Sequence, residues 1–240
     1  MGNSYYSLTL RGIRQTVLIM FERTVREVRF YTPEIFEISL DRHGYEFETG
    51  ECAVLFNDAG DSRPYSMSSA PQDDALSFLV RRLPGGALSG WLAERRPGDA
   101  VRLSPPFGEF RPTAGENPTV LIATGVGVSP FLSLLRSRPA APGPLRCLYG
   151  VRTLHDAVEL PLLREKTELQ LAVSREPDCG HFHGRVTGLG DTLSAGQGAE
   201  FYLCGYDAMI DEVSLLLNTR GVDSARIHTE VFFDSKPPAR

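Results

Sequence analysis

Short runs of apolar and polar residues, separated by turn residues, fill the first half of the chain. Glycine, proline, asparagine and aspartate lie between the runs, as expected for turns between β-strands. The β-rich runs are residues 23–31, 35–42, 51–57, 75–83 and 99–107. Regular short strands without long helical stretches predict an antiparallel β-barrel or sandwich from Thr24 to about Arg111. One helix is expected inside it, from Ser89 to Arg95.

The pattern changes after residues 112–118. Continuous apolar runs follow at residues 119–124, 145–151, 169–174, 200–205 and 226–233. Helical or turn-rich segments separate them, and apolar strands that alternate with helices predict a parallel sheet covered on both faces, here of five strands. The boundary is expected near Ala114. We therefore predict two domains, residues 1–113 with an N-terminal extension of about residues 1–20, and residues 114–240.

The composition supports this organisation and excludes some functions. A chain of 240 residues can bury one large core or two ordinary ones. The net charge of -5 argues against a nucleic-acid-binding protein, which usually carries a basic face. The four cysteines lie far apart and form no C-x-x-C pair, so zinc and iron–sulfur sites have no support and no bound metal is expected. We expect a reduced, cytoplasmic protein without membrane insertion.

A glycine-rich turn, ATGVGVSP at residues 123–130, links the first parallel strand to a helix. Gly125 and Gly127 would let the backbone approach a ligand, and the N–H groups at the start of the helix favour a pyrophosphate. Pro130 replaces the third glycine of the common dinucleotide fingerprint. A tight structural turn is the alternative interpretation.

A second glycine turn, LPGGALSGWL at residues 83–92, lies inside the β-rich half. Gly85 and Gly86 precede a predicted helix whose first turn carries Ser89, which again suits a phosphate. A simple β-turn before a capped helix explains the same residues. Two anion-binding turns in two domains would indicate two phosphorylated ligands.

The stretch RPYSMSS at residues 63–69 combines a cation, an aromatic ring and hydroxyl groups. A flavin nucleotide needs a cation for its pyrophosphate, an aromatic wall for its ring system and a small polar group near N5. Arg63, Tyr65 and Ser66 supply these types along one strand. The alternative is an ordinary strand with an exposed arginine and a half-buried tyrosine.

Four motifs in this order resemble the ferredoxin-NADP reductase family. They are RPYS, GGxxS, TGxGxSP and CGxxxM, the last formed by Cys204, Gly205 and Met209, and the resemblance extends from about Thr24 to Phe232. It implies an FAD-binding Greek-key β-barrel followed by a nicotinamide-binding α/β domain. Hydride would then pass between the two cofactor rings where the domains meet.

The resemblance also implies site residues. The FAD-binding positions would be Arg63, Pro64, Tyr65, Ser66, Val80, Arg81, Arg82, Gly85, Gly86, Ala87, Leu88, Ser89 and Phe232. Residues 80–82 would face the adenosine side through their backbone. The nicotinamide nucleotide would contact Thr124, Gly125, Gly127, Gly205 and Met209. Ser66, Cys204 and Glu230 would be the catalytic residues, although a buried small hydrophobe is the alternative for Cys204.

The choice between NADPH and NADH depends on charge. A 2′-phosphate is best recognised by arginines and hydroxyls, whereas a 2′-hydroxyl is usually accepted by a carboxylate. Ser174 and Arg175 follow the third parallel strand, and Arg152 and Arg185 resemble the other phosphate-binding arginines of bacterial family members. These residues favour NADPH, and Glu176 favours NADH.

The C-terminal segment HTEVFF resembles the Glu-Val-Tyr end of plant-type members. Glu230 matches, whereas Phe232 stands in place of tyrosine and the chain continues to Arg240. Phe232 is expected either to contact the cofactor or to pack in the core. His181 and His183 form H-x-H, for which we favour a polar loop over a metal site because no third ligand is evident nearby.

These observations predict an FAD-dependent reductase. NADPH would give a hydride to FAD, and the electrons would pass to a ferredoxin, a flavodoxin or an oxygenase component. One alternative is an NADH-dependent reductase component of a multicomponent oxygenase. Others are a non-catalytic electron-transfer or regulatory subunit with the same fold and a scaffold that binds no flavin.

Overall fold

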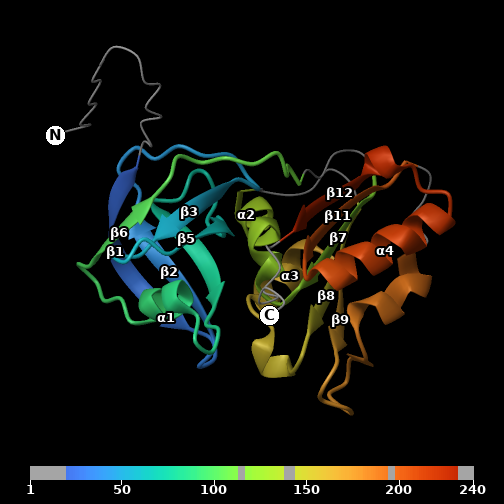
Figure 1. Ribbon diagram of the computed structural model, residues 1–240. Coiled ribbons are helices and arrows are strands. Elements are labelled where there is room, and N and C mark those ends of the chain that lie inside the picture. Colours follow the sequence, from blue (N-terminus) through green and yellow to red (C-terminus); the bar gives the residue numbers. More distant parts are fainter. Residues whose placement is uncertain (1–19, 113–116, 138–143, 194–197, 232–240) are drawn as a thin grey trace, which may run out of the picture.

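The computed structural model describes residues 20–112, 117–137, 144–193 and 198–231. Within these ranges the chain forms two six-stranded sheets, one antiparallel and one parallel, that lie next to each other (Figure 1). The antiparallel sheet is built by the first half of the chain and the parallel sheet by the second, which confirms the predicted fold class.

The antiparallel sheet has the strand order β4-β3-β6-β1-β2-β5. Its elements are β1 (Phe21–Phe30), β2 (Ile35–Asp41), β3 (Cys52–Phe56), β4 (Ser62–Ser66), β5 (Ala75–Arg81), α1 (Ala87–Ala93) and β6 (Ala100–Leu103). A bridge between Met67 and Phe78 joins the two edges, and Ser68 N–H donates to Ser77 O at 2.7 Å. The sheet therefore curls into a barrel.

Strand β2 connects the barrel to the second domain. Phe36, Ile38 and Leu40 alternate along the strand and pack in the barrel core, because successive side chains of a strand point to opposite faces. Ile35 belongs to a second core, where it is joined by Phe131 of the other domain. Both faces of β2 are therefore covered, and the two domains share an apolar core.

The parallel sheet has the order β10-β9-β8-β7-β11-β12. Its strands are β7 (Thr119–Thr124), β8 (Leu145–Val151), β9 (Glu168–Val173), β10 (Phe182–His183), β11 (Glu200–Gly205) and β12 (Ile227–Val231). Its helices are α2 (Ser129–Ser137), α3 (Leu160–Lys166) and α4 (Asp207–Thr219). The short 3-10 segments are η1 (Gly125–Val128), η2 (Leu154–Asp156), η3 (Val186–Leu193) and η4 (Ser224–Arg226).

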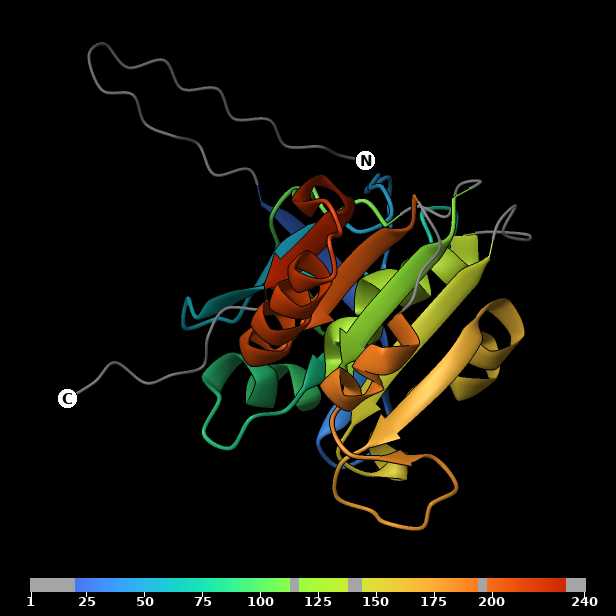
Figure 2. The same cartoon turned by 90° about the vertical axis from the view of Figure 1, so that its right-hand side faces the viewer.

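Helices cover both faces of this sheet (Figure 2). Leu132 of α2 and Leu163 of α3 pack with Leu121 and Tyr149 on the face that turns toward the barrel. On the opposite face, a separate core combines Val213 of α4 with side chains from β7, β11 and η3. The buried runs along β7 and β11 follow from this double cover.

Two details of the fold differ from the sequence prediction. The parallel sheet has a sixth strand, the two-residue β10, so His183 lies in a strand where a polar loop was expected. A segment this short carries too few residues to show an alternating pattern. Helix α1 begins at Ala87, two residues earlier than predicted. Two further predictions, the domain boundary near Ala114 and the N-terminal extension up to residue 19, lie outside the described residues.

None of the described helices is long and apolar enough to span a bilayer.

Candidate functional site

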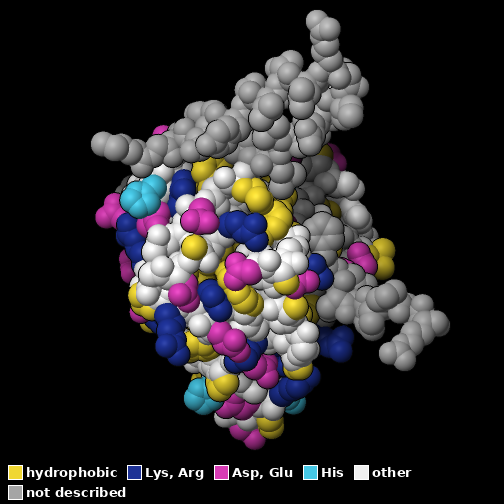
Figure 3. All heavy atoms as spheres, turned by 60° about the vertical axis from the view of Figure 1, so that its left-hand side comes forward, with side chains coloured by type: hydrophobic (Ala, Val, Ile, Leu, Met, Phe, Trp, Pro, Cys, Tyr) yellow, Lys and Arg dark blue, Asp and Glu magenta, His cyan; other side chains and the backbone are white. Residues whose placement is uncertain are grey.

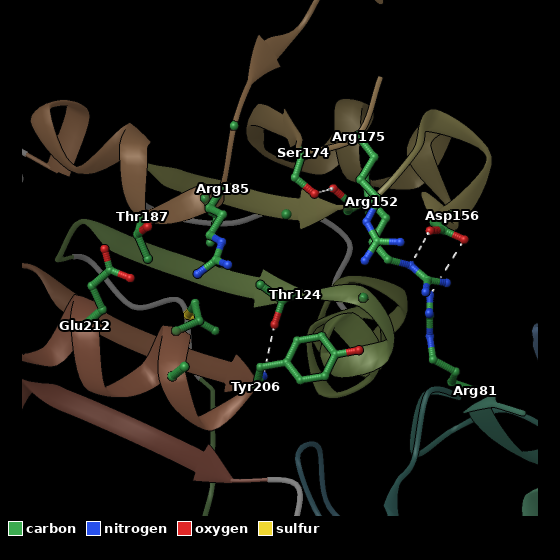
Figure 4. Close-up of a pocket in the computed structure, with 17 residues that line it drawn as sticks. Arg81, Thr124, Arg152, Asp156, Ser174, Arg175, Arg185, Thr187, Tyr206 and Glu212 are labelled. Carbon is green, nitrogen blue, oxygen red and sulfur yellow. Dashed lines mark hydrogen bonds and ion pairs between the residues drawn. The ribbon is translucent and has the colours of Figure 1, made fainter. Parts of the chain in front are cut away.

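A pocket of about 570 Å³ opens at the carboxyl ends of the parallel strands. Residues after β7, β8, β9 and β11 line it, including Thr124, Arg152, Ser174 and Tyr206 (Figure 4). Strands β8 and β9 lie on one side of β7, whereas β11 and β12 lie on the other. The pocket therefore lies where the winding of the sheet reverses, the usual ligand position in open α/β sheets.

Glycines bring backbone segments close together at one end of the pocket. Gly205 has a φ of +143°, and a Cβ there would lie 2.1 Å from the Thr124 hydroxyl oxygen, which accepts a hydrogen bond from Tyr206 N–H at 3.0 Å. Gly125, with a φ of +53°, lines the pocket. Gly127 and Gly205 do not line it, and Gly127 packs against β11, where a Cβ would meet Cys204 O at 2.5 Å.

Cationic side chains gather at the other end of the pocket. Arg152 follows β8 and Arg175 follows β9, and the Arg175 N–H donates to Arg152 O at 2.8 Å. Ser174 lies beside them, whereas Arg185 lines the pocket on the side of Thr187 (Figure 4). Within the described ranges, no carboxylate forms an ion pair with Arg175 or Arg185. Both guanidinium groups are therefore available to an anion.

Two further charged residues join this end of the pocket, and sequence reasoning did not place them there. Arg81, expected near FAD through its backbone, extends its side chain from the barrel to Asp156 at 3.7 Å, and Asp156 also pairs with Arg152 at 3.2 Å. The predicted NADH determinant, Glu176, accepts a hydrogen bond from Leu154 N–H at 2.8 Å. The Glu176 carboxylate is therefore already hydrogen-bonded to the backbone.

A second group of side chains surrounds the Glu230 carboxylate between the barrel and the parallel sheet. The Ser66 hydroxyl donates to Glu230 Oε2 at 2.7 Å, and the Cys204 thiol lies 3.7 Å from the same oxygen. The predicted catalytic residues therefore lie together. Cys52, which sequence reasoning missed, donates to Glu230 Oε1 at 3.0 Å. Cys52 could have been found only from the pairing of β3 with β4, which places it directly opposite Ser66.

Burial sets the protonation of this group. Burial raises the pKa of Glu230, and hydrogen bonds from Cys52 and Ser66 only partly oppose that effect. Burial also raises the pKa values of the Cys52 and Cys204 thiols, and the nearby Glu230 carboxylate adds to the increase. Both cysteines therefore remain thiols at neutral pH, and Glu230 is positioned to hold a proton between neutral donors.

The residues expected near FAD lie on β4, on β5 and around α1. Arg63 is exposed, and its guanidinium donates only to Ser62 O, at 2.7 Å, among the hydrogen bonds formed by the described residues. Tyr65 packs against the barrel core, and burial raises its pKa to about 12. Pro64 lies between them and is partly buried. The strand thus presents a free cation next to an aromatic ring.

The turn before α1 has a left-handed residue, Gly85, with a φ of +70°. Gly86 is the N-cap of α1 and supplies no side-chain cap, so the first N–H groups of the helix, including that of Ala87, have no side-chain partner from the cap. Ser89 accepts a hydrogen bond from Leu83 N–H at 3.1 Å, which stabilises the turn, whereas the side-chain cap expected in the structural alternative is not formed. The Leu88 side chain is buried in the barrel core, so only its backbone is available.

Other predicted positions have different surroundings. Val80 is buried in the barrel core, and exposed Arg82 pairs with Glu94 at 3.2 Å. Met209 lines the pocket. Phe232 lies outside the described residues. In the described part of the chain, which includes His181 and His183, no group of three or more His, Cys, Asp or Glu side chains is arranged to hold a metal ion.

Charges on the barrel side of the molecule are mixed. Figure 3 shows basic and acidic side chains interspersed among the described residues on this face. A surface of this kind does not produce a strong field of one sign. Recognition of another protein here would depend on local contacts more than on long-range attraction.

Two family models match the chain and divide it as the fold does. A model described as an oxidoreductase FAD-binding domain matches residues 18–111, and one described as an oxidoreductase NAD-binding domain matches residues 121–214. The first contains Arg63, Tyr65 and Ser66. The second contains the glycine turn after β7 and the arginines of the pocket.

Several known proteins are similar to the chain. The toluate 1,2-dioxygenase electron transfer component of Pseudomonas putida is 34% identical over 71% of this chain and 54% of its own length. The ferredoxin–NAD(P)(+) reductase CarAd of Metapseudomonas resinovorans is 30% identical over 88% of this chain and 69% of its own. The structure of the cytochrome P450 reductase GcoB of Amycolatopsis matches with a TM-score of 0.79 and 27% identity, covering 92% of this chain and 73% of that chain. The chain spans only about half to three fifths of several other curated relatives, from 50% to 61% of their length.

Proposed function

The chain belongs to the ferredoxin-NADP reductase family of NAD(P)H-dependent flavoprotein oxidoreductases, and we propose on this premise that it is the reductase of an oxygenase system. It would take a hydride from NADPH through FAD and deliver electrons to a ferredoxin or to an oxygenase component. The observation that carries the proposal is the arginine-rich pocket at the strand ends, in the same chain as a buried Ser66–Glu230–Cys204 group at the domain contact.

The residues of the barrel fit FAD. A pyrophosphate needs a cation and free N–H donors, and the chain offers the exposed Arg63 guanidinium and the uncapped start of α1. Tyr65 is held against the barrel core and is neutral at physiological pH, which suits packing on an aromatic ring system. Bound FAD would supply the conversion between two-electron hydride chemistry and one-electron transfer.

The pocket of the parallel domain fits a pyridine nucleotide. Gly125 lines the pocket with a left-handed φ and allows close approach of a ligand to the backbone after β7, whereas Gly205 lets Thr124 pack closely against the end of β11. Arg175 and Arg185, which lack carboxylate partners among the described residues, together with Ser174, supply donors for a 2′-phosphate. Glu176 accepts a hydrogen bond from Leu154 N–H and does not line the pocket, which weakens the argument for NADH. We therefore assign NADPH as the donor.

Glu230 would serve as a local proton store. Its carboxyl is surrounded by the Ser66 hydroxyl and two thiols, and burial raises its pKa, so it keeps a proton to higher pH than an exposed glutamate does. Ser66, in the strand that carries Tyr65, would relay a proton or orient a neighbouring polar group. Cys204 would contribute a neutral thiol and limit access of water to the site.

The choice of acceptor rests on the relatives. Those named above are electron transfer or ferredoxin reductase proteins, two of them by name parts of dioxygenase or P450 systems. A ferredoxin or an oxygenase component is therefore the acceptor that we propose, with flavodoxin as a further small redox protein to be assayed. The spread of both charge signs on the barrel side is consistent with a partner recognised by local contacts.

The decisive experiment is an absorbance spectrum of the purified chain, followed by anaerobic addition of NADPH or NADH. We expect visible flavin bands that bleach faster with NADPH. A colourless protein that cannot be reconstituted with FAD, or bands unchanged by both nucleotides, would contradict the proposal.

Substitution of Arg63 tests the FAD assignment separately. Arg63→Ala should lower FAD retention after dialysis by about tenfold or more while leaving the fold intact, because a charge-assisted contact is lost. Arg26→Ala is the matched control, since Arg26 is also an exposed arginine of the barrel, on β1. Equal retention in both variants would reject Arg63 as the pyrophosphate ligand.

A further inference from the structure

Glu34 binds a pocket arginine although it does not line the pocket. It lies in the barrel, in the turn between β1 and β2, where its N–H donates to Thr32 Oγ1 at 3.2 Å. Its carboxylate lies 2.6 Å from a terminal nitrogen of Arg152 and 3.4 Å from Arg81. A glutamate of the first domain thus forms an ion pair with an arginine that lines the nucleotide pocket of the second domain.

The two carboxylates on Arg152 are held differently. Asp156 contacts Arg152 Nε at 3.2 Å, and its side chain is only 10% exposed. Glu34 contacts the terminal NH2 group, and its side chain is 51% exposed. The buried aspartate fixes the guanidinium, because an unpaired buried charge is costly. The exposed glutamate can rotate into solvent at little cost.

We propose that Glu34 determines the nucleotide preference of the pocket by competing with the 2′-phosphate for Arg152. This inference rests on the proposed function, because it assumes that the pocket binds a pyridine nucleotide. When NADPH binds, the phosphate takes the terminal nitrogen and Glu34 leaves it. When NADH binds, the Glu34–Arg152 pair persists. Glu34 therefore lowers the affinity for NADPH selectively.

The geometry favours competition over a direct contact with the ribose. Arg152 and Arg81 line the pocket and Glu34 does not, so Glu34 acts on the ligand through these guanidinium groups, and its shorter contact is with Arg152, at 2.6 Å against 3.4 Å for Arg81. The Arg152 hydrogen bond is also the main cause of the lowered pKa of Glu34, so the carboxylate is ionised and attractive to Arg152 at neutral pH. Because the pair joins two domains, binding of the phosphate also releases one contact between them.

Calorimetric titration of the purified full chain with NADP+ and NAD+ tests the inference without turnover. Glu34→Gln should raise the NADP+ affinity by about fivefold, the value of one exposed ion pair, and leave the NAD+ affinity within about twofold. Glu168→Gln is the matched control. It removes an exposed carboxylate whose arginine partner, Arg146, lies in the same domain as Glu168. It should change neither affinity.

A double-mutant cycle assigns the effect to Arg152. In an Arg152→Ala background, adding Glu34→Gln should leave the NADP+ affinity unchanged, because the guanidinium for which Glu34 and the phosphate compete is absent and Arg81 remains paired with Asp156. An equal gain with and without Arg152 would overturn the inference. Circular dichroism of each variant confirms that the comparison is made between folded proteins.

The remaining outcomes are distinct. Equal NADP+ affinities of the wild type and Glu34→Gln would overturn the inference and leave the proposed function standing. A loss of NAD+ affinity in Glu34→Gln would also overturn it, because it would place the carboxylate on the ribose hydroxyl. If no form of the chain binds either nucleotide, the pocket is not a nucleotide site, and the proposed function fails together with this inference.

Discussion

The two domains meet through two kinds of polar contact, and these shift the pKa of a glutamate in opposite directions. At the thiol contact, formed by Cys52, Ser66, Cys204 and Glu230, the carboxylate receives hydrogen bonds from neutral donors, and burial raises its pKa. At the ionic contact, arginines surround the carboxylates. The ionic contact is formed by Arg29, Tyr31, Glu34, Glu37, Arg81, Arg136, Arg152, Asp156 and Glu159.

The difference lies in what compensates for the loss of water. Burial alone would raise the pKa of Glu159, but hydrogen bonds from Tyr31 and Arg29 outweigh it and lower the pKa. Among the described residues, a hydroxyl and two thiols form the hydrogen bonds to Glu230, and together with the charge of Arg111 they compensate less. The ionic contact therefore holds the domains together through fixed charges, whereas the thiol contact is suited to storing a proton.

The largest effect should come from breaking the ionic contact at a buried carboxylate. Arg136 of α2 donates to Glu37 Oε1 at 3.1 Å and to Ser68 O at 2.8 Å, both in the barrel. Arg136→Ala leaves the Glu37 carboxylate, with a side chain only 10% exposed, without this partner. We expect the free energy of unfolding in urea to fall by about 2 to 3 kcal/mol.

An exposed ion pair provides the control for this variant. Arg82→Ala removes an arginine that pairs with Glu94, and both side chains of the pair are largely exposed. Its free energy of unfolding should change by less than about 1 kcal/mol. Similar losses in both variants would show that burial does not distinguish the ionic contact from an ordinary surface pair.

The next effect concerns the thiol contact and depends on pH. Because the pKa of Glu230 is raised above 4.5 in the folded state, the folded protein binds a proton that the unfolded chain releases. Its stabilising contribution is complete below pH 4.5 and is lost as the pH rises through the folded pKa. Wild type should therefore lose stability relative to Glu230→Gln over this window, at up to about 1.4 kcal/mol per pH unit.

Urea unfolding of both proteins at a series of pH values from 4.5 upward measures this difference. Glu168→Gln is again the control, because its carboxylate is exposed and lies outside the thiol contact. It should follow the wild-type profile. A constant difference between wild type and Glu230→Gln across the series would mean that the thiol contact does not favour the protonated carboxyl.

The two contacts also differ in how far the sequence could predict them. Ser66, Cys204 and Glu230 were expected together because each lies in a motif of the family, and the structure places them within hydrogen-bonding reach. Cys52 carries no motif, and only the pairing of β3 with β4 brings it to Glu230. The alternation of short strands and the apolar parallel runs predicted both sheets, since burial on one or two faces leaves a regular pattern.

The ionic contact could not be read from the sequence. Glu34 and Arg152 are 118 residues apart, and neither position differs in type from the many exposed charged residues of the chain. Arg81 was expected to act through its backbone, but its side chain reaches Asp156 in the other domain. Such pairs depend on how the domains are placed relative to each other, and local periodicity contains no information about that placement.

The smallest expected effect comes from the most exposed member of the ionic contact. Glu34→Gln removes a partly exposed pair with Arg152, so the unfolding midpoint in urea should fall only slightly at low ionic strength. At about 1 M salt, where the Debye length is about 3 Å, wild type and variant should have the same midpoint. Arg136→Ala, measured alongside, should keep most of its deficit in salt, because Glu37 is buried. A deficit of Glu34→Gln that survives high salt would place Glu34 with the buried members of the contact, and its carboxylate could then not leave Arg152 as easily as a competing phosphate requires.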